Sequence, residues 1–336
     1  MKKILVSGYI GFNNFGDEAI FYALVNHLKS LKFKVCALCN NPKDVKNKYD
    51  VDTFYYKNPI QIIKAIIDCD ILYSGGGSLL QNKTGNFSLY YYLLIILTAK
   101  FFCKKVFIFS QGIEPVNGKF SEFFLKFVLK QADYITVRDN NSLNYLKTLN
   151  INSDLTSDPV YSLVENYKIS SEKKGLIVQL RDFKDFNKNI PADLAYSLKG
   201  YKDTVRVLSL QNEVDEKICK TLVEKLNSEG VKARYTPFYS IEKTFDIINQ
   251  AEFMISTRLH GAILANALKV KTFALIYDDK VRSLADEFKI QNVDLKNYTQ
   301  NELDKKLKKF FKSEVSDIPY RKFDWSLTDM KLLKRK

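Results

Sequence analysis

The chain has 336 residues, of which 46% are hydrophobic and 27% charged, and its formal net charge is +14 at neutral pH. This length and composition are typical of a globular protein with two domains of ordinary size. Five cysteines in so large a chain argue against a disulfide framework, so we expect a reducing, cytoplasmic environment. The apolar start ends too early for a signal peptide, and the most apolar segment, residues 89–102, is too short to span a bilayer.

The positive charge comes mainly from lysines that are dispersed over the whole sequence. It favours anionic partners, among them phosphorylated small molecules and an anionic membrane surface. Nucleic acid is not expected as a partner, because the sequence has no zinc finger, no RNP-type aromatic signature and no concentrated basic arm.

The first half of the chain alternates apolar, strand-like runs with helical patterns. Strands are predicted at residues 3–7, 34–38, 70–73, 105–110 and 134–137, and helices at 17–31, 60–67, 89–99 and 121–131. Strands separated by helices indicate a parallel, doubly wound sheet, in which the loops at the carboxyl ends of the strands meet at one edge.

A polar segment at residues 164–175 is the best linker candidate and precedes a second alternating series. Its strands are predicted at 176–180, 205–210, 232–235, 252–255 and 272–277, and its helices at 213–227, 241–249, 259–268 and 278–288. The expected fold class is α/β, with two Rossmann-like doubly wound domains that face each other across a cleft. We place the domains at residues 1–165 and 166–300, followed by a tail, 301–336, that packs back on the first domain.

Glycine-rich loops follow two strands of the first half. The loop from Gly8 to Glu18 allows tight turns before a helix that could hold an anion or a hydroxyl, although a turn with an Asp helix cap is the alternative. It matches neither GxGxxG nor the P-loop. Three successive glycines after the strand at 70–73 suggest close approach of a ligand to the backbone. The predicted acceptor-binding or cleft-lining residues are Asn14, Gly16, Asp17, Gly75, Gly76, Gly77, Ser78 and Gln111.

Cationic groups gather after two strands of the second half. Arg258, His260 and Gly261 lie at the start of one predicted helix, and Lys280 lies at the start of the next. Each charged residue could simply be solvated or cap a helix. The sequence has only one other histidine, His27, which lies in an ordinary amphipathic helix and is interpreted as structural. His260 is therefore the better candidate for proton transfer near neutral pH.

Taken together, these motifs resemble the polysaccharide pyruvyl transferase family, and they occur in order from about residue 7 to residue 288. The resemblance is greatest to the bacterial enzymes that modify secondary cell-wall polysaccharide, which serves to anchor surface-layer proteins. The matching segments are Gly8 to Glu18, Ser74 to Gln81, Gln111-Gly112, Val137 to Asp139, Asp158-Pro159, Arg258 to His260, and Tyr277 to Val281.

The resemblance implies a GT-B-like fold and phosphoenolpyruvate as a co-substrate rather than a cofactor. No metal is expected, because the sequence has only two histidines and no carboxylate cluster at metal-ligand spacing in its motifs. The resemblance implies catalytic roles for His260, Lys280 and Arg138. Arg258, Gly261 and Lys280 would bind the donor in the second domain, and the first domain would bind the acceptor. The acceptor would be a lipid-diphosphate-linked saccharide ending in N-acetylmannosamine, on which a 4,6-pyruvate ketal forms at the inner face of the cytoplasmic membrane.

Two residues depart from the family pattern: Glu114 stands where a glycine is usual, and Asp279 where a proline is usual. Extra carboxylates near an anionic donor could alter the choice of acceptor. Two other functions fit the same fold: a glycosyltransferase with a nucleotide-sugar donor, and a non-catalytic sugar-binding protein. The Arg-Leu-His motif with a lysine twenty residues later argues against the first, and the intact Arg138, His260 and Lys280 argue against the second.

Overall fold

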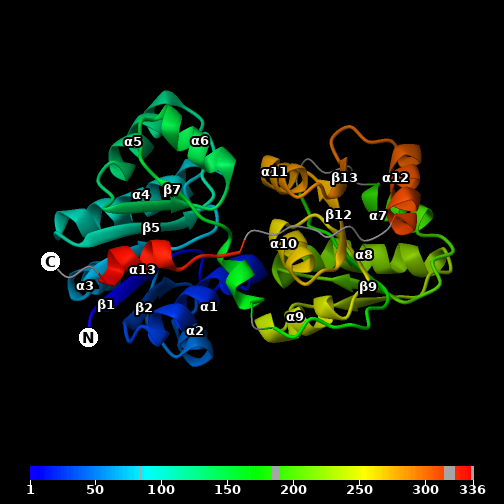
Figure 1. Cartoon of the computed structure of the whole chain (residues 1–336), viewed down its shortest axis with the longest axis horizontal. Coiled ribbons are helices and arrows are strands. Elements are labelled where there is room, and N and C mark those ends of the chain that lie inside the picture. The colour runs from blue at the N-terminus through cyan, green and yellow to red at the C-terminus, as the bar shows by residue number, and fades with distance from the viewer. Residues whose placement is uncertain (84, 166, 184–188, 314–321, 334–336) are drawn as a thin grey trace. The chain divides into compact units, whose positions relative to one another are not determined.

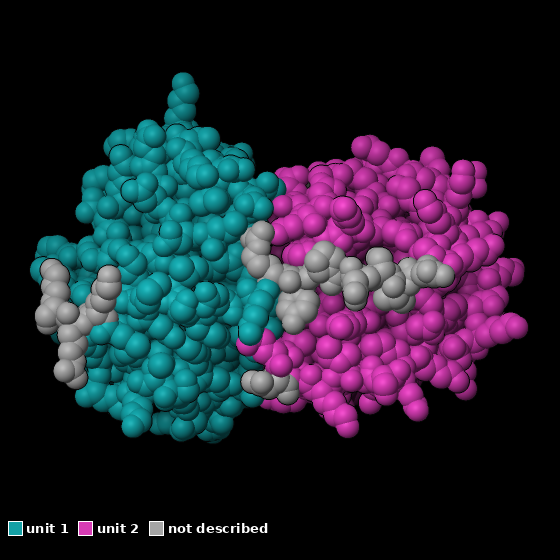
Figure 2. Space-filling model, viewed as in Figure 1, with its two compact units in different colours: residues 1–12, 17–163, 321–336 teal, residues 13–16, 164–320 magenta. Residues whose placement is uncertain are grey.

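The computed structural model describes residues 1–83, 85–165, 167–183, 189–313 and 322–333. The chain divides into two compact units, each built on one parallel sheet (Figure 1). Unit 1 comprises Met1–Phe12, Asp17–Leu163 and Arg321–Lys336, and unit 2 comprises Asn13–Gly16 and Val164–Tyr320 (Figure 2). The prediction of two Rossmann-like, doubly wound domains is confirmed.

Unit 1 has a seven-stranded sheet with the strand order β3-β2-β1-β4-β5-β6-β7. The strands are β1 (Lys3–Ser7), β2 (Lys34–Cys39), β3 (Asp52–Tyr55), β4 (Ile71–Ser74), β5 (Lys105–Gln111), β6 (Tyr134–Val137) and β7 (Asp154–Leu155). All four residues of β4 are buried. Burial on both faces explains why the central strands read as continuous apolar runs in the sequence.

Helices cover both faces of this sheet. They are α1 (Phe15–Ser30), α2 (Pro42–Tyr49), α3 (Pro59–Asp68), α4 (Asn86–Phe101), α5 (Lys119–Leu129), α6 (Asn140–Thr148) and the 3₁₀ helix η1 (Pro159–Leu163). The buried residues of α3 to α6 share one hydrophobic cluster with alternate residues of β1, β2, β4, β5 and β6. Right-handed crossovers account for this grouping, since the chain crosses to the other face after β3.

The end of the chain completes unit 1 through an aromatic cluster. Trp325, just before α13 (Ser326–Leu333), stacks on His27 of α1 with ring centroids 3.8 Å apart, and on Phe109 at 5.7 Å. His27 Nε2 also lies 2.8 Å from a carboxylate oxygen of Asp329. His27 thus has structural partners, and Phe323 is almost fully buried beside Phe109.

Unit 2 has a six-stranded sheet with the strand order β10-β9-β8-β11-β12-β13. The strands are β8 (Leu176–Gln179), β9 (Val205–Leu208), β10 (Ala233–Thr236), β11 (Phe253–Ser256), β12 (Lys271–Ile276) and β13 (Gln291–Asp294). The helices are α7 (Ile190–Ser197), α8 (Asn212–Ser228), α9 (Ile241–Asn249), α10 (Leu259–Ala267), α11 (Asp279–Glu287) and α12 (Gln300–Lys312).

Several short elements were not predicted, and most of them bury few residues. α2 buries only Val45 and Tyr49, and β3 has no fully buried residue. The elements missed are α2, β3, α6, β7, η1, α7, β13 and α13. The tail also differs from the single segment expected at 301–336. Leu303, Leu307 and Phe310 of α12 belong to the core of unit 2, whereas the residues from 322 onward belong to unit 1.

Replacing Phe323 by Ala should destabilise unit 1, because it empties a site at which the ring is only 2% exposed. We expect a loss of about 3–5 kcal/mol in the free energy of unfolding, measured by denaturant titration. Leu333→Ala is the control in the same tail, because that side chain is 55% exposed. Equal stability of the two variants would contradict the packing described for the tail.

Candidate functional site

Each sheet has a point at which the strand order reverses. In unit 1 it lies between β1 and β4, and in unit 2 between β8 and β11. In open α/β sheets, ligands bind outside the carboxyl ends of the strands at such points. The glycine loops at residues 8–16 and 75–77 follow β1 and β4, and the segment from Thr257 to His260 follows β11. Many of the predicted site residues therefore lie at the two positions that the fold favours for binding, whereas Gln111, Arg138 and Lys280 lie at or just beyond the ends of the strands β5, β6 and β12.

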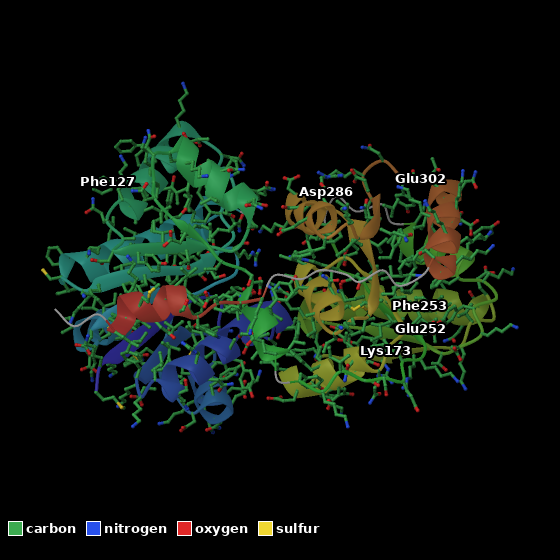
Figure 3. The ribbon with its side chains drawn as sticks, in the orientation of Figure 1. Phe127, Lys173, Glu252, Phe253, Asp286 and Glu302 are labelled. Carbon is green, nitrogen blue, oxygen red and sulfur yellow. The ribbon has the colours of Figure 1, made fainter. Side chains whose placement is uncertain are left out.

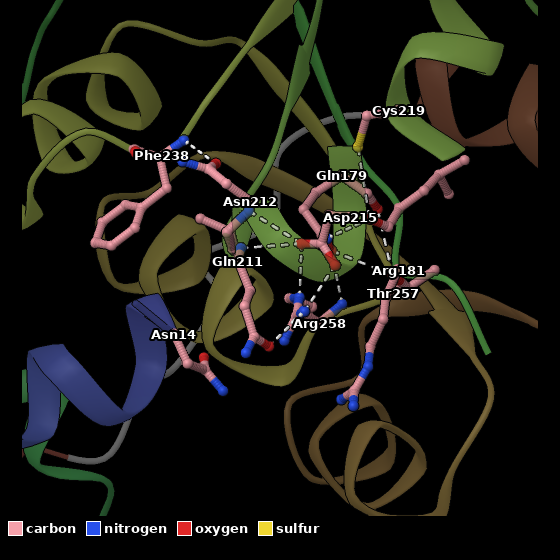
Figure 4. Close-up of polar contacts among 12 residues, drawn as sticks. Asn14, Gln179, Arg181, Gln211, Asn212, Asp215, Cys219, Phe238, Thr257 and Arg258 are labelled. Carbon is pink, nitrogen blue, oxygen red and sulfur yellow. Dashed lines mark hydrogen bonds and ion pairs between the residues drawn. The ribbon is translucent and has the colours of Figure 1, made fainter. Parts of the chain in front are cut away.

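A buried polar network organises the edge of unit 2 (Figure 4). Arg258 donates from Nε and Nη2 to the two carboxylate oxygens of Asp215, at 2.9 and 2.7 Å, and from Nη2 to Gln211 at 3.1 Å. The Oε1 atom of Gln179, at the end of β8, accepts a hydrogen bond from the backbone N–H of Arg258 at 2.9 Å. This network fixes the backbone turn between β11 and α10.

Arg258 is thus an internal partner of Asp215. Its side chain is almost fully buried, and Asp215 has no exposed surface. Because the pair is charge-balanced and bidentate, Nε and Nη2 already have strong partners. The role that the geometry gives to Arg258 is to position the segment that carries His260.

His260 and Lys280 occupy corresponding positions in unit 2. Each is the second residue of a helix that starts at the carboxyl edge of the sheet, His260 in α10 and Lys280 in α11. The preceding strands, β11 and β12, are paired neighbours, and α10 packs on α11. The N-terminus of α10, which has no side-chain cap, makes a region suited to anions together with the imidazole and the ammonium group, whereas Asp278 caps the N-terminus of α11.

The segment Asn13–Gly16 from the first loop belongs to unit 2. The backbone N–H of Phe15 donates to the carbonyl of Leu210 at 2.9 Å, and the Phe15 ring packs on Phe238 and Phe245. A methyl group on Gly16 would lie 1.9 Å from Nδ1 of His260. Gly16 therefore leaves the space that the imidazole occupies. Asn14 accepts a hydrogen bond from the Gly16 N–H at 3.2 Å.

Gly261 has a packing role in the same turn. A methyl group there would lie 2.7 Å from Oγ of Ser256 and 3.0 Å from the Leu210 side chain. A residue without a side chain lets α10 approach the sheet closely.

Sequence reasoning missed Arg181, which follows β8 at the same edge. Its Nη1 donates to the hydroxyl of Tyr277 at 3.4 Å, and Tyr277 stacks on Phe183 with ring centroids 3.9 Å apart. Burial raises the pKa of Tyr277, so its hydroxyl stays protonated at neutral pH. The buried Nε of Arg181 has no hydrogen-bond partner among the described residues. The position of Arg181 at the reversal point between β8 and β11 could have identified it as a site residue. That position can be recognised only when the strand order is known.

In unit 1, Gln111 braces the loop of three glycines. Its amide nitrogen donates to the carbonyl of Gly75, and its Oε1 accepts from the N–H of Leu79 at 3.3 Å. A shift in register between β5 and β6 just before Gln111 redirects the side chain toward this loop. A methyl group on Gly77, where φ is +96°, would lie 2.7 Å from a carboxylate oxygen of Asp17. The loop thus needs glycine both for its conformation and for space, while a methyl group on Gly76 would clash with Ile20.

Arg138 is also held by partners inside unit 1. Its Nη1 donates to Asp158 at 3.0 Å and its Nη2 to Oγ of Ser78 at 3.0 Å. A methyl group on Gly112 would lie 2.8 Å from the guanidinium group. The Gln-Gly pair therefore supports the glycine loop and gives Arg138 room beside it.

The sequence has two unexpected carboxylates, Glu114 and Asp279, and each interacts with groups close to it in the structure. Glu114 lies 3.0 Å from the ammonium group of Lys83. Asp279 is the exposed first residue of α11, where a negative charge stabilises the positive end of the helix. Among the described residues, no group of three or more His, Cys, Asp or Glu side chains is arranged to hold a metal ion.

The sequence model of the polysaccharide pyruvyl transferases matches residues 14–279, which is most of the chain. The chain belongs to the polysaccharide pyruvyl transferase family. The matched range includes the glycine loop, Gln111, Arg138, Arg258 and His260, and it ends one residue before Lys280. No curated protein matches the sequence.

Solved structures resemble this pyruvyl transferase family member in fold. A putative UDP-N-acetylglucosamine 2-epimerase from Listeria monocytogenes has a TM-score of 0.70 at 11% identity and covers 99% of this chain and 95% of its own. S. aureus MnaA with UDP has a TM-score of 0.66 at 14% identity with the same coverages. Acinetobacter baumannii MurG has a TM-score of 0.57 at 13% identity over 99% of both chains. The fold is GT-B-like.

A Gly16→Ala substitution should displace the His260 ring, because the added methyl group would overlap Nδ1. The chain has only two histidines, so histidine-ring NMR resolves His260 from His27. We expect the His260 signals to shift and the His27 signals to stay. Gly8→Ala is the matched control, since a methyl group there meets only Ile10 at 3.4 Å. Unchanged His260 signals in the Gly16 variant would contradict the geometry.

Proposed function

We propose that this protein transfers the pyruvyl group of phosphoenolpyruvate to a saccharide and forms a cyclic ketal with release of phosphate. Membership in the pyruvyl transferase family supports the reaction class. The observation that carries the proposal is the placement of His260 and Lys280 as second residues of the adjacent helices α10 and α11, at the carboxyl edge of one sheet.

The donor carries a carboxylate and a phosphate, so its site needs several positive groups. The N-terminus of α10, Lys280 and Arg181 supply them within unit 2. Arg258 acts through the backbone, because its guanidinium is paired with Asp215. We assign it and Gly261 as positioning residues for the donor site.

The chemistry requires proton movement that an imidazole can perform near neutral pH. Protonation of the methylene carbon makes the neighbouring carbon electrophilic, and a sugar hydroxyl adds to it. Phosphate then leaves, and a second hydroxyl of the same sugar closes the ring. Of the two hydroxyl protons, one ends on the new methyl group and the other leaves with phosphate. We propose His260 and Lys280 as the pair that moves these protons and stabilises the charge on phosphate.

We propose unit 1 as the acceptor side. Asp17 and Ser78 supply a carboxylate and a hydroxyl for hydrogen bonds to a sugar, and the buried glycine loop lies beside them. Arg138 donates to Ser78 and so holds that hydroxyl in place. The sequence resembles most the enzymes that modify secondary cell-wall polysaccharide. We therefore propose as the acceptor a lipid-diphosphate-linked saccharide that bears N-acetylmannosamine.

Replacing His260 by Ala should lower the rate of phosphate release from phosphoenolpyruvate by about 10² to 10⁴-fold, the usual contribution of a positioned acid or base. The assay supplies acceptors that end in N-acetylmannosamine, galactose or glucuronate. His27→Ala is the matched control, because His27 contacts Trp325 and Asp329 in unit 1. A His260→Ala protein with normal turnover would refute the proposed role.

The competing function is glycosyl transfer from a nucleotide sugar, since the structural neighbours include proteins solved with UDP or UDP-N-acetylglucosamine. Thermal denaturation with each ligand separates the two. We expect phosphoenolpyruvate to raise the melting temperature by mass action and UDP-N-acetylglucosamine to leave it unchanged. Stabilisation by the nucleotide sugar alone would favour the alternative.

Replacing Arg181 by Ala should weaken phosphoenolpyruvate binding, because it removes a charge-assisted hydrogen-bond donor. Such bonds contribute about 1.5–3 kcal/mol, so we expect KM for the donor to rise about 10- to 100-fold with a smaller change in kcat. Arg181→Lys should recover part of the loss. Arg234→Ala, an exposed arginine on β10, is the control. A donor KM equal to that of the Arg234 variant would exclude Arg181 from the site.

A further inference from the structure

Large apolar side chains gather on the outer sides of three helices of unit 1. Phe87 and Phe101 of α4 are 83% and 80% exposed, and Phe120 of α5 is 69% exposed. The described residues include fifteen exposed large hydrophobic side chains, and nine of these lie on α3, α4 and α5. The nine are Ile60, Ile63, Ile67, Phe87, Leu94, Phe101, Phe120, Phe123 and Phe127.

The spacing of these residues places them on one side of each helix. Phe87, Leu94 and Phe101 recur every seven residues along α4, while its opposite side contributes buried residues to the core. α3 packs on α4, and α4 packs on α5. Phe127 can be located on α5 in Figure 3. The three outer sides therefore form one surface, which we call the α3–α5 face.

Exposed apolar side chains in such number call for a partner. Scattered surface hydrophobics are normal, but a contiguous apolar surface on a water-soluble unit marks a site of interaction. The core does not require these rings, because the inner sides of α3, α4 and α5 already fill the space against the sheet.

The charge of the α3–α5 face helps to decide which kind of partner binds there. The helices and their flanks, residues 57–68, 86–105 and 119–130, contain eight lysines and only two acidic residues, Asp68 and Glu122. Asp68 is paired with Lys3 and so adds little negative charge, and Lys100 is likewise paired with Asp133, which leaves seven of the eight lysines against Glu122. The eight lysines are Lys57, Lys64, Lys100, Lys104, Lys105, Lys119, Lys126 and Lys130.

This combination disfavours self-association and fits a lipid surface. A two-fold dimer through the α3–α5 face would bring the lysines of one copy toward those of the other. An anionic leaflet instead attracts each lysine, while aromatic and aliphatic side chains enter the boundary between headgroups and acyl chains.

We propose that the α3–α5 face is a docking surface for an anionic phospholipid bilayer. No described helix is long and apolar enough to span a membrane, so attachment through this face would be peripheral. The proposal rests on surface chemistry and stands apart from the proposed pyruvyl transfer.

The position of the face relative to the acceptor side is favourable for a lipid-linked ligand. Phe87 and Phe120 lie in the first turns of α4 and α5, which start at the carboxyl edge of the sheet. Gly75 to Gly77 and Gln111 lie at the same edge. A headgroup held at the bilayer surface would therefore approach the edge that carries the glycine loop.

Vesicle sedimentation tests the proposal with the full chain. The probes are phosphatidylcholine vesicles with and without phosphatidylglycerol. We expect binding to the anionic vesicles at low salt, and a fall at ionic strengths near 1 M, where the Debye length is about 3 Å. The triple variant Phe87→Ser, Phe120→Ser, Phe123→Ser should bind at least about tenfold more weakly, because it removes three inserting rings.

The matched control is the double variant Tyr196→Ser, Tyr239→Ser, which removes exposed aromatic rings of unit 2 and should bind as the wild type does. Circular dichroism and phosphate release on a soluble acceptor establish that each variant is folded. Equal binding by the triple variant and the wild type would overturn the proposal. So would a wild-type dimer in sedimentation velocity that becomes a monomer in the triple variant, because the face would then be a contact between copies.

Discussion

The buried ion pair between Arg258 and Asp215 is the interaction on which the site in unit 2 depends. Asp215 accepts hydrogen bonds from the backbone N–H groups of Leu210 and Gln211 and from the guanidinium, so one carboxylate joins the start of α8 to the start of α10. Removing either partner would leave an uncompensated charge in the interior, which costs about 3–5 kcal/mol. Since Arg258 is itself the residue that precedes α10, the pair fixes the start of the helix that carries His260 as its second residue.

In each unit, a buried glutamine at the end of a strand fixes the backbone of a neighbouring loop. Gln179 ends β8 and binds the backbone of Arg258, and Gln111 ends β5 and binds the backbone of Leu79. Both side chains are fully buried and hydrogen-bonded through both ends of the amide. A satisfied buried amide fixes its neighbours more firmly than a surface contact can, because an unmade bond in the interior has no water to replace it. The loops that carry the proposed chemistry are therefore held at their bases by satisfied buried hydrogen bonds.

The basic residues that produce the net charge of +14 occur in at least two kinds of surroundings. Arg138 and Arg258 are buried and balanced by Asp158 and Asp215. The lysines around α3, α4 and α5 stand instead beside exposed phenylalanines and isoleucines, with few carboxylates nearby. Balanced arginines organise loops, whereas lysines with little compensation attract anions over a Debye length. The amino-acid composition alone does not distinguish the buried, paired arginines from the exposed lysines.

The sequence by itself determined the alternation of strands and helices, the glycine loops and the family motifs, because periodicity and motif spacing are local properties of the chain. It placed His260 and Lys280 correctly at helix starts, but it did not reveal that Arg258 pairs with Asp215, 43 residues away. Only the tertiary structure decided the surroundings of Arg181 and Gly16, since both depend on strand order and on contacts between distant segments. It also decided that the tail divides between the units, because α12 and the Trp325 segment bury their apolar residues in different cores.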